Sequence, residues 1–129
     1  MLVADFTDHV QGWRIIAAPE ALDAAPWPAG SQVVRISPDD AFVIGGVEPT
    51  VPLDPHAIVT PEFGFSVAAV LDVAALAERH IEWQLPVARP ALAQGQIAGV
   101  PAKLVLHADG SVQLLVACAA RHELQERLA

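Results

Sequence analysis

Cysteine and lysine are almost absent from this chain of 129 residues, which contains one of each, Cys118 and Lys103. A single cysteine excludes an intramolecular disulfide and gives no zinc-ligand pattern. Fifteen acidic residues against seven basic ones give a formal net charge of −8. A surface of this charge repels phosphate backbones and anionic lipids, so neither nucleic acid nor a membrane surface is an expected partner.

Long apolar runs and catalytic motifs are also missing. No apolar run approaches the roughly 20 residues that span a bilayer, and the N-terminal residues lack the basic start and apolar core of a signal peptide. We therefore expect a cytoplasmic protein. The patterns G-x-G-x-x-G, G-x-x-x-x-G-K, G-x-S-x-G and C-x-x-C do not occur. The sequence predicts no catalytic residue and no metal ligand.

Hydrophobic residues, in contrast, are abundant at 53%, with 17% charged residues. This composition is typical of a packed domain, and the length fits one domain over residues 1–129. The mean hydropathy is +0.42, so apolar surface is expected to remain after one small core is filled. Such surface usually marks a contact with another protein.

The clearest local patterns are two outlines of a hairpin followed by a helix, at residues 32–83 and 97–128. In the first, strands at 32–36 and 41–44 are joined by the turn Ser-Pro-Asp-Asp, whose proline presets φ. We therefore predict an α+β fold. Its antiparallel sheet comes from two hairpin-plus-helix halves, with the helices on one face.

The first predicted helix spans residues 72–83, with Asp72 at its start and Pro86 marking its end. Its apolar positions have helical spacing and form one stripe: Val73, Leu76, Ala77, His80 and Ile81. The residues before it predict strands at 2–6, 13–17 and 63–70 and a helical turn opened by Pro19. A proline-rich surface loop is expected at 47–61, with a short edge strand at 57–60.

The C-terminal third predicts a second hairpin and the final helix. Residues 97–100 and 102–107 have strand character interrupted by Pro101, after a connector at 85–90. Ala108-Asp109-Gly110 is a turn, because glycine accepts positive φ. A strand at 112–117 then leads to a helix at 117–128. Its expected buried side consists of Ala117, Ala120, Leu124 and Leu128.

Three side chains on the final helix, Cys118, His122 and Glu126, are spaced i, i+4, i+8 and share one face. Thiol, imidazole and carboxylate can bind a metal or form a nucleophile–base pair. A structural zinc site needs four ligands, however, and this face lies away from Leu124. We therefore interpret the three residues as a solvated helix face.

Two further groups of polar residues lie near turns. Asp5, Asp8 and His9 have the chemistry for acid–base work or a weak metal site. Asp54 and His56 flank a proline in the proline-rich loop. Polar turns are much commoner than catalytic ones, so the simpler interpretation of both groups is turn formation.

Two stretches resemble the small gamma subunit of heterotetrameric sarcosine oxidase. The first is VRISPDDAFVIG at residues 34–45. The second covers residues 71–128, from LDVAALAE through QGQIAGVPAKLVLHADGSVQLLVACAARHELQERL. The resemblance covers about two thirds of the chain. One departure is Ala41-Phe42, where the family typically has a tryptophan after the acidic pair.

This resemblance implies a duplicated α+β fold, similar to the folate-binding domain of aminomethyltransferases. In the sarcosine oxidase complex the larger subunits carry the flavins, NAD and the folate site, and the gamma subunit is an assembly component. No catalytic residues carry over to this chain. FAD, FMN, NAD or tetrahydrofolate is expected only in a partner subunit.

The sequence thus favours a non-catalytic subunit or interaction module that docks on a larger flavoprotein subunit or forms a homo-oligomer. In this hypothesis Phe42, Phe63 and Phe65 are contact or core residues. The alternative is a stand-alone domain that binds a folate-like small molecule, with a pocket lined by the loop at 49–61. A third hypothesis is a hydrolase that uses one of the Asp/His pairs.

Overall fold

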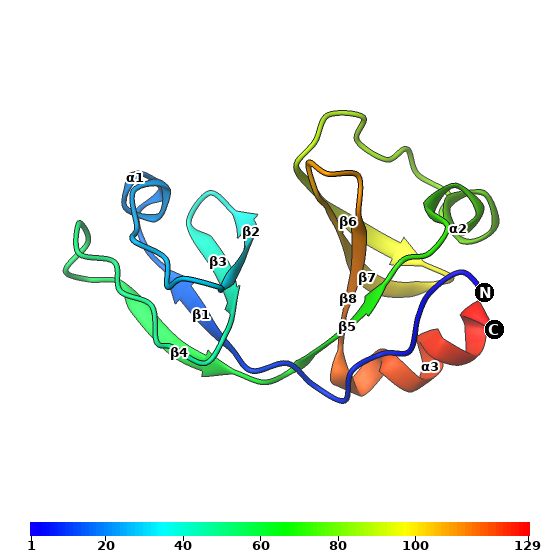
Figure 1. Ribbon diagram of the computed structural model, residues 1–129, viewed down its shortest axis with the longest axis horizontal. Helices are drawn as coiled ribbons and strands as arrows, with labels where there is room; N and C mark the ends of the chain where they lie inside the picture. The colour runs from blue at the N-terminus through cyan, green and yellow to red at the C-terminus, as the bar shows by residue number, and fades with distance from the viewer. The chain divides into compact units, whose positions relative to one another are not determined.

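The computed structural model describes residues 1–129, which form two compact units. One unit is Val10–Phe63. The other joins Met1–His9 to Gly64–Ala129, and we call it the Gly64–Ala129 unit. Each unit has a four-stranded antiparallel sheet, and the chain has three helices (Figure 1). The predicted α+β class is confirmed, with the strands divided between two sheets; the single domain stays a prediction.

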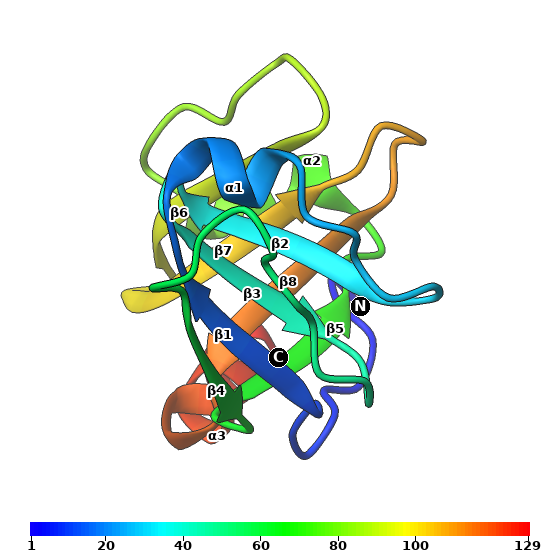
Figure 2. The ribbon, with the colours of Figure 1, turned by 90° about the vertical axis from the view of Figure 1, so that its left-hand side faces the viewer.

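The sheet of the Val10–Phe63 unit has the strand order β2-β3-β1-β4. The short helix α1 (Pro19–Asp23) begins at Pro19 as predicted and lies across one face of this sheet (Figure 2). The predicted hairpin and the predicted edge strand are both present. The strands are β1 (Gly12–Ile16), β2 (Gln32–Ser37), β3 (Asp40–Ile44) and β4 (Ile58–Glu62).

The core of this unit lies between α1 and the sheet, because alternate residues of each strand point to the helix side. Ile15 and Val43 on the strands and Leu22 on α1 are completely buried there. Trp13 and Trp27 pack against the same cluster. The remaining residues of β1 and β4, every second one along each strand, therefore point to the opposite face of the sheet.

The sheet of the Gly64–Ala129 unit has the order β5-β8-β7-β6. Its core holds residues of one sheet face together with Leu76 of α2 and Leu124 and Leu128 of α3, which places both helices on one face of this sheet. The predicted hairpin-plus-helix half at 32–83 is divided between the units, because its hairpin belongs to the Val10–Phe63 unit and its helix to this one. The elements are β5 (Phe65–Ala69), α2 (Val73–His80), β6 (Ala91–Ile97), β7 (Val100–Leu106), β8 (Val112–Ala117) and α3 (Cys118–Leu128).

Helix α2 begins as predicted and ends earlier than predicted. The side chain of Asp72 accepts a hydrogen bond from Ala75 N (3.0 Å), so it is the N-cap. The helix stops at His80, because Ile81 has extended backbone angles (φ −123, ψ 122). The carbonyl of His80 then accepts a hydrogen bond from Ala98 N (2.9 Å), which ties the helix end to the β6–β7 turn.

The prediction of a strand at 97–100 is wrong. Ile97 and Val100 pair across a two-residue turn, in which Ala98 (φ 50) and Gly99 (φ 78) both have positive φ. A whole strand, β6, lies before this turn. Pro101 is tolerated in β7, because β8 pairs only with the later part of that strand, from Lys103 to Leu106.

The predicted strand at 2–6 is also not formed as a regular element. The N-terminal segment has one bridge, Val3 to Val70, and is otherwise irregular. It still runs along β5, with hydrogen bonds from Ala4 N to Ala69 O (2.8 Å) and from Thr7 N to Val67 O (3.0 Å). These bonds satisfy backbone groups on the outer edge of β5.

Candidate functional site

Two isoleucines stand side by side and exposed on the sheet face opposite α1. Ile16 of β1 and Ile58 of β4 are directly paired across the strands. Their exposed fractions are 41% and 58%. Leu53, in the loop that leads to β4, is 67% exposed. We call Ile16, Leu53 and Ile58 the β4 surface.

The exposure of these side chains follows from the two-residue period of a strand. In β1, Ile15 and Ile16 are adjacent, and Ile15 is buried in the core. In β4, Val59 packs against the same core, so its neighbour Ile58 faces outward. The sequence feature that predicts this surface is a pair of adjacent large apolar residues in a half-buried strand, because only one of the two can face the core.

An ion pair lies next to Ile16 on the same face. Arg14 donates from Nε and Nη2 to the two carboxylate oxygens of Asp40, with both distances 2.6 Å. The hydrogen bond to Asp40 raises the pKa of the Arg14 guanidinium. Asp40 also stands opposite Ile16 in the ladder between β1 and β3. The exposed isoleucines are therefore bordered by charges that are already neutralised by each other.

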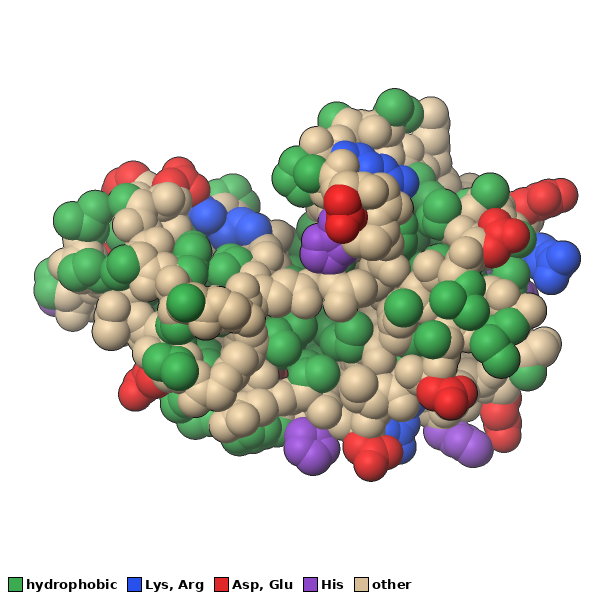
Figure 3. Space-filling view, viewed as in Figure 1, with side chains coloured by type: hydrophobic (Ala, Val, Ile, Leu, Met, Phe, Trp, Pro, Cys, Tyr) green, Lys and Arg blue, Asp and Glu red, His purple; other side chains and the backbone are tan.

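The loop before β4 is held by Asp54. Its carboxylate accepts hydrogen bonds from Ala18 N (2.8 Å) and from His56 N (2.9 Å). These two backbone donors lower the pKa of Asp54. The residue thus has a structural role in fixing the loop onto α1. Figure 3 shows that apolar side chains gather over this loop, where Leu53 is exposed.

The free edge of β4 is not suited to strand addition. Gly45 N donates to Gln11 O, so Gln11 and, two residues on, Trp13 direct their backbone groups to β3. Pro61 is paired with Trp13 and consequently turns its nitrogen to the open edge. A proline nitrogen has no hydrogen to donate, which protects an edge strand from pairing. A partner protein at this edge of the sheet would therefore contact side chains and would not add a strand.

The three phenylalanines predicted as contact or core residues have different environments. Phe42 is completely buried, with its ring over Gly12 of the neighbouring strand. Phe63 is 50% exposed. Phe65 is partly buried, and the ammonium of Lys103 lies 5.6 Å from the centre of its ring. Phe63 is the most accessible of the three.

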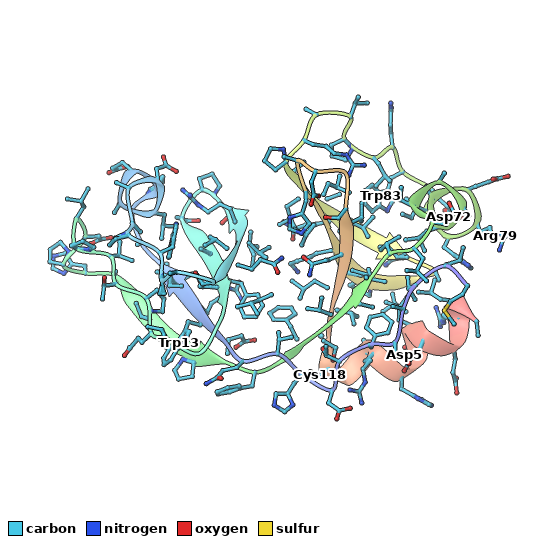
Figure 4. All side chains as sticks on the ribbon, in the orientation of Figure 1. Asp5, Trp13, Asp72, Arg79, Trp83 and Cys118 are labelled. Atoms are coloured by element: carbon cyan, nitrogen blue, oxygen red, sulfur yellow. The ribbon has the colours of Figure 1, made fainter.

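The residues Cys118, His122 and Glu126 do not form one constellation. The thiol of Cys118, which is labelled in Figure 4, lies 3.3 Å from Ser66 Oγ and 3.4 Å from the carbonyl oxygen of Asp8. His122 and Glu126 pair with each other at 3.1 Å on the exposed side of α3. No group of three or more His, Cys, Asp or Glu side chains is placed to hold a metal ion.

The acidic N-terminal residues are structural where the structure gives them partners. Arg121 of α3 donates to the carbonyl oxygens of Thr7 (3.1 Å) and Asp8 (2.8 Å) and to the Asp8 carboxylate (3.2 Å). Asp5 and Asp8 both have exposed side chains. These contacts fasten the N-terminal segment to α3.

Comparison with known proteins gives no matching family model and no similar curated protein. None of the three helices is long and apolar enough to cross a membrane.

Proposed function

We propose that this chain is a non-catalytic subunit or protein-interaction module, similar to the gamma subunit of heterotetrameric sarcosine oxidase. It docks through the β4 surface on a larger flavoprotein subunit or on a second copy of itself. Flavin, NAD or tetrahydrofolate belongs to the partner subunit, and the complex is cytoplasmic.

The observation that carries this proposal is the exposed cross-strand pair of Ile16 and Ile58. Complete burial of an exposed isoleucine side chain stabilises by about 1.5–3 kcal/mol. Ile16 and Ile58 are about half exposed, so a partner that covers them gains roughly half of this value for each. Exposed apolar groups that are rimmed by polar residues are typical of protein contact sites. The neighbouring Arg14–Asp40 pair supplies such a polar rim.

The geometry of β4 favours a side-chain contact. Pro61 blocks strand addition at the edge, and the bonds of Asp54 fix the loop that carries Leu53. A partner therefore meets a surface whose backbone is already set. Little conformational entropy is lost when such a surface binds.

The test is affinity purification of the tagged chain from its native host, followed by identification of the proteins that remain bound. The wild type is compared with the double variant Ile16→Lys/Ile58→Lys and with the single variant Leu53→Lys. Val87→Lys is the matched control, because Val87 is 89% exposed and lies outside the β4 surface. Thermal unfolding of each variant checks that the fold is kept.

The expected result is a stoichiometric partner with the wild type and with Val87→Lys, and loss of that partner with both β4-surface variants. A folded double variant that retains the same partner in the same amount would exclude the β4 surface as the docking site. A wild type that retains no partner and is monomeric would exclude the subunit function itself.

A further inference from the structure

A hollow of about 530 Å³ lies at the C-terminal end of α2, within the Gly64–Ala129 unit. Its volume is within the range of small-molecule sites. Arg79, His80, Glu82 and Trp83 come from the end of α2 and the residues after it, and Gln96, Ala98 and Gly99 come from β6 and its turn. The hydrogen bond from Ala98 N to His80 O holds the two sides together.

Two opposite charges in this hollow have no partner within the chain. The five ion pairs of the molecule involve neither Arg79 nor Glu82, and neither side chain forms a hydrogen bond. Residues three apart on a helix are normally neighbours and form such pairs. Here the helix ends between them, because Ile81 is extended. The helix end therefore keeps a cation and an anion apart at one hollow.

A hydrogen-bonded aromatic side chain forms another part of the wall. The indole Nε1 of Trp83 donates to the carbonyl oxygen of Gln96 (3.0 Å), and the ring lies against Gly95. Figure 4 shows Trp83 on the side of α2 that faces the strands and Arg79 on the other side. An indole fixed in this way offers apolar surface, and it also attracts ammonium groups.

The charges decide which class of ligand fits. A simple carboxylate would be attracted by Arg79 but would meet Glu82 and the carbonyl end of α2, which carries partial negative charge. A simple amine would be attracted by Glu82 but repelled by Arg79. A molecule with both charges satisfies both side chains, and an apolar group on it can contact Trp83.

We propose that this hollow is a binding site for a small zwitterion of the free amino-acid class. The ligand carboxylate binds Arg79, the ammonium group binds Glu82, and the side chain lies against Trp83. This site is independent of the β4 surface and does not depend on the proposed docking.

The experiment is an NMR titration of the full wild-type chain, which follows the indole N–H resonance of Trp83. The probes are the proteinogenic amino acids, added singly. The expected result is a saturable shift for at least one of them, with a dissociation constant on the order of 1 mM or below. If no amino acid shifts the Trp83 resonance, the proposal is overturned.

The two charges are then tested separately. For the amino acid that binds, the amine without the carboxylate and the acid without the amine are each expected to bind at least about tenfold more weakly. Arg79→Gln is expected to weaken binding of the amino acid as much as removal of its carboxylate does. Glu82→Gln is expected to weaken binding as much as removal of the ammonium group does. Arg89→Gln is the control, because Arg89 is exposed and lies outside the hollow. An acid or amine that binds as tightly as the amino acid, or a Glu82→Gln variant with unchanged affinity, would overturn the zwitterion site.

Discussion

Trp83 and Gly95 are in such close contact that no larger residue fits at position 95. A Cβ on Gly95 would lie 2.5 Å from Cε2 of the Trp83 ring. The ring is held there by its hydrogen bond to Gln96 O (3.0 Å). This contact joins the residues after α2 to β6 and forms one wall of the hollow.

Gly95→Ala is therefore expected to destabilise the protein by about 1–3 kcal/mol, since the Trp83 ring must move away from its position. The free energy of unfolding by urea measures the effect. Gly46→Ala is the control, because a Cβ there meets its nearest atom at 3.5 Å. In the background of Trp83→Leu the cost of Gly95→Ala should largely disappear, and an equal cost in both backgrounds would show that the ring is not the cause.

Trp13 and Trp83 should respond differently to replacement by phenylalanine. The Nε1 of Trp13 is buried without a hydrogen-bond acceptor, and such a group costs about 1–3 kcal/mol. Trp13→Phe removes this cost together with some buried area, so its net effect on the unfolding free energy should stay within about 1 kcal/mol. Trp83→Phe loses a formed hydrogen bond and should be the more destabilising of the two in the same urea measurement.

The pKa of Asp54 predicts a pH dependence of stability. It is lowered by hydrogen bonds from Ala18 N and His56 N. A carboxylate whose pKa is lower in the folded state stabilises the protein above the unfolded pKa of about 3.9 and loses this effect as pH falls through the folded pKa. Asp54→Asn should therefore be less stable than the wild type at neutral pH. The two unfolding curves should converge in acid, and a difference that is constant with pH would contradict this assignment.

The stabilisation by the Arg14–Asp40 ion pair should depend on the planar shape of the guanidinium group. Two parallel bonds of 2.6 Å join the side chains, and lysine cannot form both. Arg14→Lys is expected to destabilise the protein by about 1 kcal/mol. The exposed i, i+4 pair of Arg127 and Glu123 provides the comparison. Arg127→Gln also loses a bond to Ala98 O in the β6–β7 turn. It should therefore shift the backbone amide resonances of that turn in NMR spectra, whereas Arg14→Lys should leave those resonances unchanged.

The sequence predicted those elements whose ends are marked by specific residues. Asp72 caps α2, Pro19 opens α1, and the turn after His107 has Gly110 at φ 91. The strand β6 was missed because its residues, ALAQGQI, have weak alternation and few β-branched side chains. The turn that follows β6 was mistaken for a strand, because Ala98 has a positive φ and an alanine in the sequence does not predict one.

The candidate sites were harder to predict than the elements. The exposure of Ile16 depends on which of two adjacent isoleucines the sheet turns to the core, and this requires the register with β3 and β4. The hollow at Arg79 and Glu82 depends on the early end of α2, whereas the predicted helix ran on to Trp83 and would have paired the two charges.

The mass and the visible absorption spectrum of the tagged protein purified from its native host test the central claim most directly. The claim predicts a stoichiometric complex with a larger protein that has flavin absorption, or a colourless homo-oligomer if the chain docks on itself. A colourless monomer with the 13.6 kDa mass of the chain would contradict it.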